Sequence, residues 1–258
     1  MVKASAAKVA GKPRLRTAAK LRLRDVKTGR DKAAPAAKAR KLAGKVSTKA
    51  EPSVRERILD VAERLFAEYG MTGVGLRAIT TEAKVNLASI AYHFGSKEGL
   101  LEAIFAQRAA PIAEERLRLL AACYEGAKKP TLEELLEAFL RPALVLGMQP
   151  QFGGPAFAKL RARLAAAPEA LSRKILSKAF DFSSRKYIDA IAQTLDDLPR
   201  ADVEWRFHFM LGAMYYTMAN SGRMQTLTGG RIDPGNVKRA LRHMVPFLAA
   251  GFRSVPVA

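Results

Sequence analysis

Apolar residues in the stretch 53–105 recur at intervals of three and four positions, the spacing that places side chains on one face of an α-helix. The first stripe consists of Val54, Ile58, Val61, Ala62, Leu65, Phe66 and Tyr69. Gly70 follows it, and glycine takes the left-handed conformation that ends a helix without strain. The pattern therefore predicts one amphipathic helix over residues 54–69.

Two shorter helices are predicted next, over residues 76–83 and 87–94, with Asn86 as the N-cap of the second. Small or branched apolar residues lie on both sides of the turn at 84–86, and we expect them to be buried together: Ala78, Ile79, Ala83, Val85 and Ile90. The two helices must then pack closely at a steep angle, which leaves the second one exposed. This is the arrangement of a helix-turn-helix, whose second helix enters the DNA major groove.

The remaining sequence predicts a larger set of helices. They are expected over residues 96–124, 132–146, 156–166, 168–195, 200–219 and 234–252, with loops at 147–155 and 220–232. Thr131 and Glu134 are spaced as a capping box, and Asp233 is expected to cap the last helix. Pro111 and Pro142 fall inside two of the helices and predict kinks. No alternation typical of β-strands is present, so the fold class is all-α, with a three-helix head and a larger helical bundle.

Most of the formal charge of +20 lies in residues 1–50, which hold 16 Lys or Arg against two acids and no aromatic residue. Such a composition cannot form a packed core, so we expect a disordered basic tail. Three interpretations of this tail are open: a solvated extension, an arm that binds DNA phosphates without sequence preference, or an organelle transit peptide.

The sequence offers no catalytic constellation. The three histidines are far apart, none has metal-ligand spacing with Cys123, and no phosphate-binding loop or nucleophile elbow is found. We therefore expect no enzyme activity, no metal and no cofactor. No run of eighteen apolar residues and no secretory signal occur, so no membrane partner is expected. A single cysteine cannot form an internal disulfide, which favours the reducing cytoplasm, with the protein associated with the nucleoid.

The head resembles the DNA-binding domain of the tetracycline-repressor (TetR) family of bacterial regulators. The similar stretches are ILDVAERLFAEYG, LRAITTEAKVN and LASIAYHFGSKEGLL, and the most specific feature is Tyr92-His93-Phe94 followed closely by Ser96-Lys97-Glu98. Gly75 and Lys84 depart from the family pattern, which usually has Thr or Ser and Gly there. The resemblance implies a DNA-binding domain over 51–98 and a ligand-binding and dimerisation domain over 99–258.

The resemblance further implies a homodimeric repressor that a hydrophobic small molecule releases from a palindromic site on double-stranded DNA. Phosphate contacts are expected from Arg77, Thr80, Thr81, Tyr92 and Lys97. Base contacts are expected from Leu87, Ala88, Ser89 and His93. The alternative is a nonspecific DNA-compacting protein that acts through its basic tail.

Dimerisation is expected through residues 200–219 and 234–252. The first of these helices is apolar on every side, and a second copy of the pair would cover the face that its own subunit leaves open.

The effector site is expected among large apolar residues of the body: Phe139, Phe157, Phe182, Trp205, Phe209 and Met214. The segment WRFHFMLGA resembles fatty-acid-responsive members of the family, which implies an acyl or acyl-CoA effector. Its acidic group would be met by Lys159, Arg161, Arg163 or Arg206, although the first three also fit a solvated helix face. The alternative effector is an aromatic or cationic drug, as in an efflux regulator.

Overall fold

The computed structural model describes residues 51–126 and 129–256 of the 258-residue chain. Within these ranges the regular structure consists of ten α-helices and two 3-10 turns, and no strand, which confirms the all-α prediction. The tail predicted over residues 1–50 lies outside the described residues.

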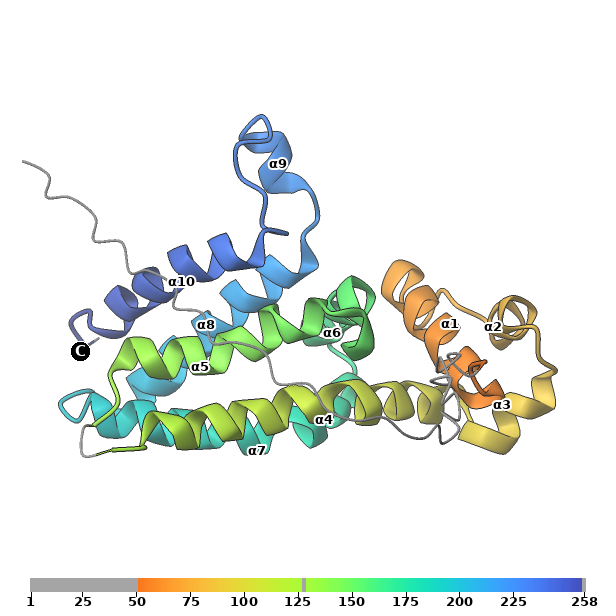
Figure 1. Cartoon of the computed structure of the whole chain (residues 1–258), viewed down its shortest axis with the longest axis horizontal. Helices are drawn as coiled ribbons and strands as arrows, with labels where there is room; N and C mark the ends of the chain where they lie inside the picture. The colour runs from red at the N-terminus through yellow and green to blue at the C-terminus, as the bar shows by residue number, and fades with distance from the viewer. Residues whose placement is uncertain (1–50, 127–128, 257–258) are drawn as a thin grey trace, which may run out of the picture. The chain divides into compact units, whose positions relative to one another are not determined.

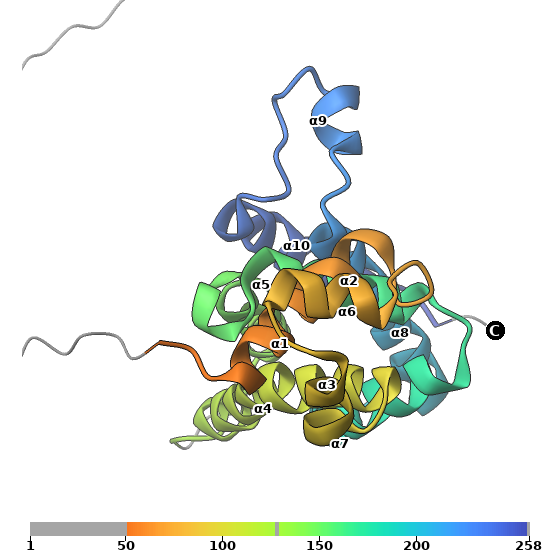
Figure 2. The ribbon, with the colours of Figure 1, turned by 90° about the vertical axis from the view of Figure 1, so that its right-hand side faces the viewer.

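The head is formed by α1 (Val54–Tyr69), α2 (Leu76–Ala83) and α3 (Leu87–Phe94), which gather at the N-terminal end of α4 (Lys97–Cys123) in Figures 1 and 2. A capping box between Ser53 and Glu56 starts α1, and Gly70 ends it with a φ of 76°. The side chain of Asn86 accepts a hydrogen bond from the Ser89 N–H at 2.8 Å and so caps α3, as predicted. Ser96 caps α4 in the same way.

The two departures from the family pattern are visible in the backbone. Gly75 precedes α2 without any side-chain cap, and Lys84 ends α2 in the left-handed conformation with a φ of 54°. That conformation costs a residue with a side chain about 1 kcal/mol. Ile79, Ala83 and Ile90 are buried as expected, whereas Ala78 is exposed and does not belong to the helix-helix interface.

The hydrophobic core of the head extends into the body. The same cluster of buried residues contains Phe66 of α1, Ile104 of α4, Phe157 of α6 (Gly154–Ala166) and Phe180 of α7 (Ala170–Thr194). The rings of Phe105 and Phe157 meet edge to face, with their centroids 5.1 Å apart. Helices α4 and α6 therefore join the head to the body through packed side chains.

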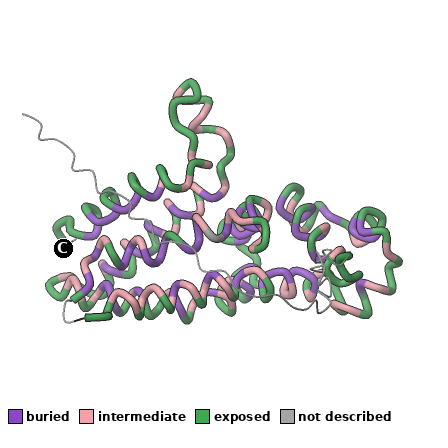
Figure 3. The backbone as a smooth tube through the Cα atoms, in the orientation of Figure 1, coloured by how far each residue is buried: buried purple, intermediate pink, exposed green. Residues whose placement is uncertain are grey.

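A second core lies between α5 (Leu132–Leu144), α7, α8 (Arg200–Ala219) and α10 (Val237–Phe252). Thr131 and Glu134 form the predicted capping box of α5. Buried and exposed positions alternate along these helices in Figure 3, as expected of amphipathic helices around a common interior. The buried side of α8 consists of Val203, Phe207, Met210, Met214 and Met218.

Three local predictions were wrong. The expected loop 147–155 contains the 3-10 turns Leu146–Met148 and Pro150–Phe152, and the expected loop 220–232 contains the short helix α9 (Arg223–Leu227). The N-cap of α10 is Asn236, whose side chain accepts from the Arg239 N–H, and not Asp233. Asp233 instead accepts from the Gly235 N–H at 2.8 Å, which closes a turn just before the helix.

Candidate functional site

The outward face of α2 and α3 is the candidate nucleic-acid interface. Because Ile79, Ala83 and Ile90 turn into the core, the opposite sides of both helices face solvent. Tyr92 is 85% exposed and Leu87 is 51% exposed. Large apolar side chains exposed together typically mark a surface that binds another molecule.

The structure gathers most of the predicted DNA-binding residues on this face. Arg77, Thr81, Leu87, Ala88 and Tyr92 are exposed, and Ser89, His93 and Lys97 are half-buried. Thr80 does not belong to the face, because it is buried and its hydroxyl donates a hydrogen bond to the Arg77 carbonyl at 3.0 Å. The uncapped N-terminus of α2 was not predicted as a contact, although backbone N–H groups at a helix start attract phosphate.

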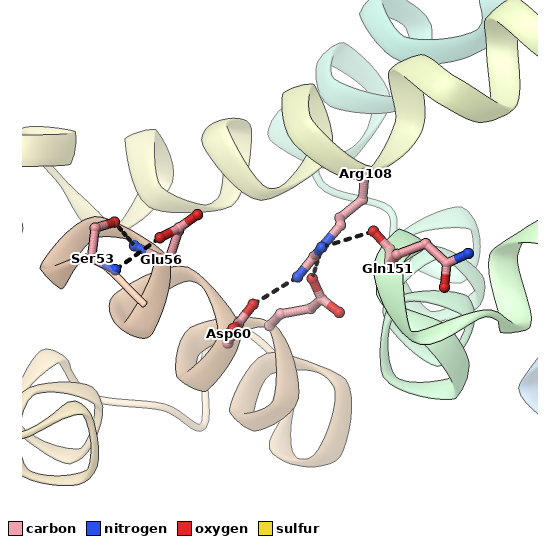
Figure 4. A network of polar contacts seen from close by, with 6 residues as sticks. Ser53, Glu56, Asp60, Arg108 and Gln151 are labelled. Atoms are coloured by element: carbon pink, nitrogen blue, oxygen red, sulfur yellow. Dashed lines mark hydrogen bonds and ion pairs between the residues drawn. The ribbon is translucent and has the colours of Figure 1, made fainter. Parts of the chain in front are cut away.

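Arg108 of α4 ties the head to the body through the polar contacts drawn in Figure 4. Its Nε donates to Glu63 Oε2 at 2.8 Å and its Nη2 to Asp60 Oδ1 at 2.7 Å, both on α1. Its Nη1 donates to the carbonyl oxygen of Gln151 at 3.2 Å. Glu63 is only 4% exposed, and burial raises the pKa of its carboxyl while the bond from Arg108 opposes the rise.

Helix α6 makes a second connection to α1. Arg163 Nη2 donates to the Glu68 carbonyl at 2.9 Å, and Phe157 enters the head core from the same helix. Gly153, just before α6, has a φ of 89°, and a Cβ there would lie 2.7 Å from Glu63 Oε1. Only glycine allows the backbone to approach α1 so closely.

Two arginines lie fully inside the protein. Arg116 of α4 is 1% exposed and Arg161 of α6 is 0% exposed. Arg116 Nε donates to the Phe139 carbonyl at 3.0 Å, and its guanidinium carbon lies 3.7 Å from the centre of the Phe139 ring. None of the three side-chain nitrogens of Arg161 makes a hydrogen bond. Both guanidinium carbons lie near the Phe180 ring, at 5.6 Å from its centre for Arg116 and 4.6 Å for Arg161.

The surroundings of this arginine pair disfavour its charge. Burial and, to a smaller extent, the charge of Arg161 lower the pKa of Arg116 to about 9. Burial also lowers the pKa of Arg161, and the nearby Tyr215 side chain partly opposes this effect. Neither arginine takes part in an ion pair among the described residues.

Of the four basic residues predicted to meet an acidic effector, only Arg161 lies in the interior. Arg206 bonds the Phe252 carbonyl at 2.6 Å and pairs with Asp202, so it holds the end of α10. Arg163 is committed to Glu68, and Lys159 is exposed. Arg116 was missed, although it follows the buried Ile112 by four positions and so occupies the apolar stripe of α4.

The predicted effector residues divide into two groups. Phe139, Phe157 and Met214 surround the arginine pair, with Arg116 Nη2 3.6 Å from the Met214 sulfur and Arg161 Cζ 5.8 Å from the Phe157 ring centre. Phe182, Trp205 and Phe209 are instead on the surface and more than half exposed. The structure therefore does not bring all six together.

A pocket of about 1150 Å³ lies between α6 and α8. Apolar side chains line much of it, including Met148, Ala162, Leu211 and Met218. Tyr215 lines it too, and the centre of its ring is 6.0 Å from Arg161 Cζ. Neither Arg116 nor Arg161 lines the pocket, so Tyr215 is the contact between the pocket and the arginine pair. None of the six predicted apolar effector residues lines it, but Lys159 and Arg163, two of the predicted partners of an acidic group, do.

Within residues 51–126 and 129–256, no cluster of His, Cys, Asp and Glu has the composition of a metal site. In the same ranges no helix is both long and apolar enough to span a membrane.

A helix-turn-helix head that shares its core with a helical body defines the class of helix-turn-helix transcriptional regulators. Residues 58–104 match the family model of bacterial regulatory proteins of the tetR family, and residues 137–251 match that of the tetracyclin-repressor-like C-terminal domain. The chain belongs to the TetR family, as its sequence predicted. Members of this family are DNA-binding regulators and not enzymes.

Two curated relatives match the chain over part of their length. The regulatory protein RaaS of Mycobacterium tuberculosis is 46% identical over 54 residues, which are 21% of this chain and 25% of RaaS. The transcriptional repressor NicS of Pseudomonas putida is 35% identical over 89 residues, 34% of this chain and 42% of NicS. The chain therefore spans less than half the length of these relatives.

The solved structure of a protein from Shewanella sp. PV-4, assigned to the tetR family of transcription regulators, has the same fold. Its TM-score is 0.54 at 18% sequence identity, over 77% of this chain and 97% of that one.

The link through Arg108 leads to a prediction about stability. Arg108→Met leaves the buried Glu63 carboxylate without its cation, so we expect the free energy of unfolding to fall by about 3 kcal/mol. Because burial already raises the Glu63 pKa, its unfavourable charge is present above the folded-state pKa and is lost as the pH falls through it. The deficit should therefore be smaller at about pH 5 than at about pH 8.

Urea unfolding measures this effect. The double variant Arg108→Met/Glu63→Met should recover much of the loss, since it removes both charges. Arg118→Met is the matched control, because Arg118 pairs with Glu115 on the exposed side of the same helix and its loss should not be measurable. Equal losses for Arg108→Met and Arg118→Met would contradict the account.

Proposed function

We propose that the protein is a homodimeric repressor that binds palindromic DNA through its head and releases it when an apolar small molecule binds the body. The observation that carries this proposal is the exposed face of α3, held in place by a core that continues into α4 and α6. Under this proposal the protein acts in the cytoplasm, where its DNA target lies.

On the DNA, α3 would enter the major groove with Leu87, Ala88, Ser89 and His93 toward the base edges. Exposed apolar groups such as Leu87 and Ala88 suit contacts with thymine methyl groups. Phosphates would be met by the side chains of Arg77, Thr81, Tyr92 and Lys97 and by the N–H groups at the start of α2. The proposal omits Thr80, since its hydroxyl is buried.

The second subunit is proposed to cover the outer faces of α8 and α10. Trp205, Phe209 and Tyr216 recur along one side of α8 and are each 58% exposed or more, and Phe247 of α10 is 73% exposed. Gly212 lies at the same spacing on α8, is exposed, and leaves open space beside it. Aromatic side chains so exposed are typical of subunit interfaces. Met244 of α10 does not lie on this outer face, because it is buried in the subunit core.

Helix α6 is the proposed route from effector to DNA. It lines the pocket through Ala162 and touches α1 through Arg163 and Phe157. An effector that binds one position of α6 better than another would shift the position of the head. The rival proposal of a DNA-compacting protein needs neither this pocket nor an exposed apolar α3.

Selection from a pool of random DNA tests the main proposal, using the full chain. We expect a palindromic sequence to be enriched. Leu87→Ala should relax the preference at one position of each half-site, a change of about 1–3 kcal/mol in discrimination. Arg77→Ala should weaken binding to all sequences alike and reduce the salt slope by about 0.9 for each of the two subunits. Arg185→Ala, on the exposed surface of α7, is the control and should change neither.

Enrichment of no sequence would overturn the proposal of a specific regulator. Binding that remained strong but showed no preference would favour the compacting protein.

Sedimentation at micromolar concentration tests the dimer. The wild-type chain should sediment as a dimer, and Phe247→Arg or Gly212→Trp should shift it toward the monomer with its helix content retained. Phe182→Arg is the matched control, because Phe182 is 67% exposed on α7 and lies outside the proposed interface. A wild-type monomer, or equal dissociation by Phe182→Arg, would argue against this interface.

A further inference from the structure

The buried arginines carry more positive charge than their surroundings balance. Removing a guanidinium from water costs several kcal/mol unless an anion and further hydrogen bonds compensate. Arg116 donates to one backbone carbonyl and to the Met214 sulfur and lies over the face of Phe139. Among the described residues, Arg161 has the rings of Phe157, Phe180 and Tyr215 near it. No ion pair of the described residues includes either side chain, so this part of the chain supplies no compensating anion.

We infer that Arg116 and Arg161 bind the carboxylate of the effector, and that the effector is therefore an apolar carboxylic acid whose hydrocarbon part lies in the pocket between α6 and α8. That the bound acid regulates DNA binding rests on the proposed function. Binding of the acid involves residues of the body alone.

The N–H groups of the Arg161 guanidinium are free to bind a carboxylate. Aromatic rings cover the faces of the guanidinium groups, and a guanidinium meets carboxylates through the N–H groups on its edge. All three side-chain nitrogens of Arg161 lack a hydrogen-bond partner although the residue is 0% exposed. The backbone passes close to this point at Gly147, where a Cβ would be in van der Waals contact with Arg161 Nη1 at 3.8 Å.

The pocket supplies space for the apolar part of the acid. Its lining includes Met148, Ala162, Leu211 and Met218, so each methylene buried there contributes about 0.8 kcal/mol. Tyr215 stands between the pocket and Arg161, and its half-buried ring marks the point where the acid group would pass inward. Two buried positive charges would repel a cationic drug at the same place.

Helix α6 connects this site to the head. Arg161 is two residues from Arg163, which bonds the Glu68 carbonyl of α1. A carboxylate that draws Arg161 into a fixed position would therefore act on the helix that contacts α1.

Isothermal titration of the full chain in the absence of DNA tests the inference with three probes of equal chain length: dodecanoate, dodecanol and dodecyltrimethylammonium. We expect dodecanoate to bind at least about tenfold more tightly than dodecanol, as a charge-assisted bond to a buried partner predicts. The ammonium probe should bind most weakly. Arg161→Met should remove the preference for dodecanoate over dodecanol, and Arg161→Lys should keep part of it.

The melting temperature of the free protein separates a binding role from a structural one. Arg161→Met should keep or raise Tm without ligand, because it removes an uncompensated buried charge. Dodecanoate should raise the Tm of the wild type more than that of the variant. Dodecanoyl-CoA, which has no free carboxylate at the chain end, should bind more weakly than the free acid.

Equal affinities for dodecanoate and dodecanol, tighter binding of dodecanoyl-CoA, or a lower Tm with unchanged preference in Arg161→Met would each overturn the inference. These outcomes are independent of DNA selection. A protein that selects a DNA sequence but ignores dodecanoate loses this inference alone, and one that binds dodecanoate but selects no sequence loses the proposed function alone.

Discussion

The packing of α6 against α1 is the interaction on which the arrangement of the site depends. Phe157 of α6 lies in the same core as the helices of the head, and Gly153 lets the backbone before α6 come within contact of Glu63. Because packed interiors transmit displacement and do not absorb it, α6 and α1 cannot move independently. Ala162 of this helix lines the pocket and Arg161 lies on it too, so α6 connects the body with the candidate DNA-binding head.

The buried charged groups differ in whether they have a partner of opposite charge. Glu63 is buried but meets Arg108, and that pair binds two helices together at the price of desolvation. Arg116 and Arg161 are buried without an acidic partner among the described residues, and burial lowers the pKa of both. Sequences generally avoid such groups, and places where they persist are typically functional sites. The stability that the pair costs is what an acidic ligand would restore on binding.

Much of the fold could be predicted from the sequence because its signals are local. The caps Asn86 and Thr131 and the apolar stripe of α1 each act within one or two turns. The start of α10 was misplaced because Asp233 and Asn236 are both good caps and only the turn at Gly235 decides between them. The proposed effector site depends on contacts between segments that are distant in the sequence. Hydrophobic size alone did not separate the buried Phe139 from the exposed Trp205. The position of Arg116 on the apolar stripe of α4 indicates burial, but its contacts to Phe139 of α5 and Met214 of α8 join segments far apart in the sequence.

Coupling between the body and the head is the central claim, and thermodynamic linkage measures it most directly. The affinity for the selected DNA is determined with and without saturating dodecanoate, and the affinity for dodecanoate with and without saturating DNA. If α6 joins the two sites, the acid should weaken DNA binding by about fivefold or more, and DNA should weaken binding of the acid by the same factor. Affinities that are unchanged in both directions, with both ligands bound, would contradict the account.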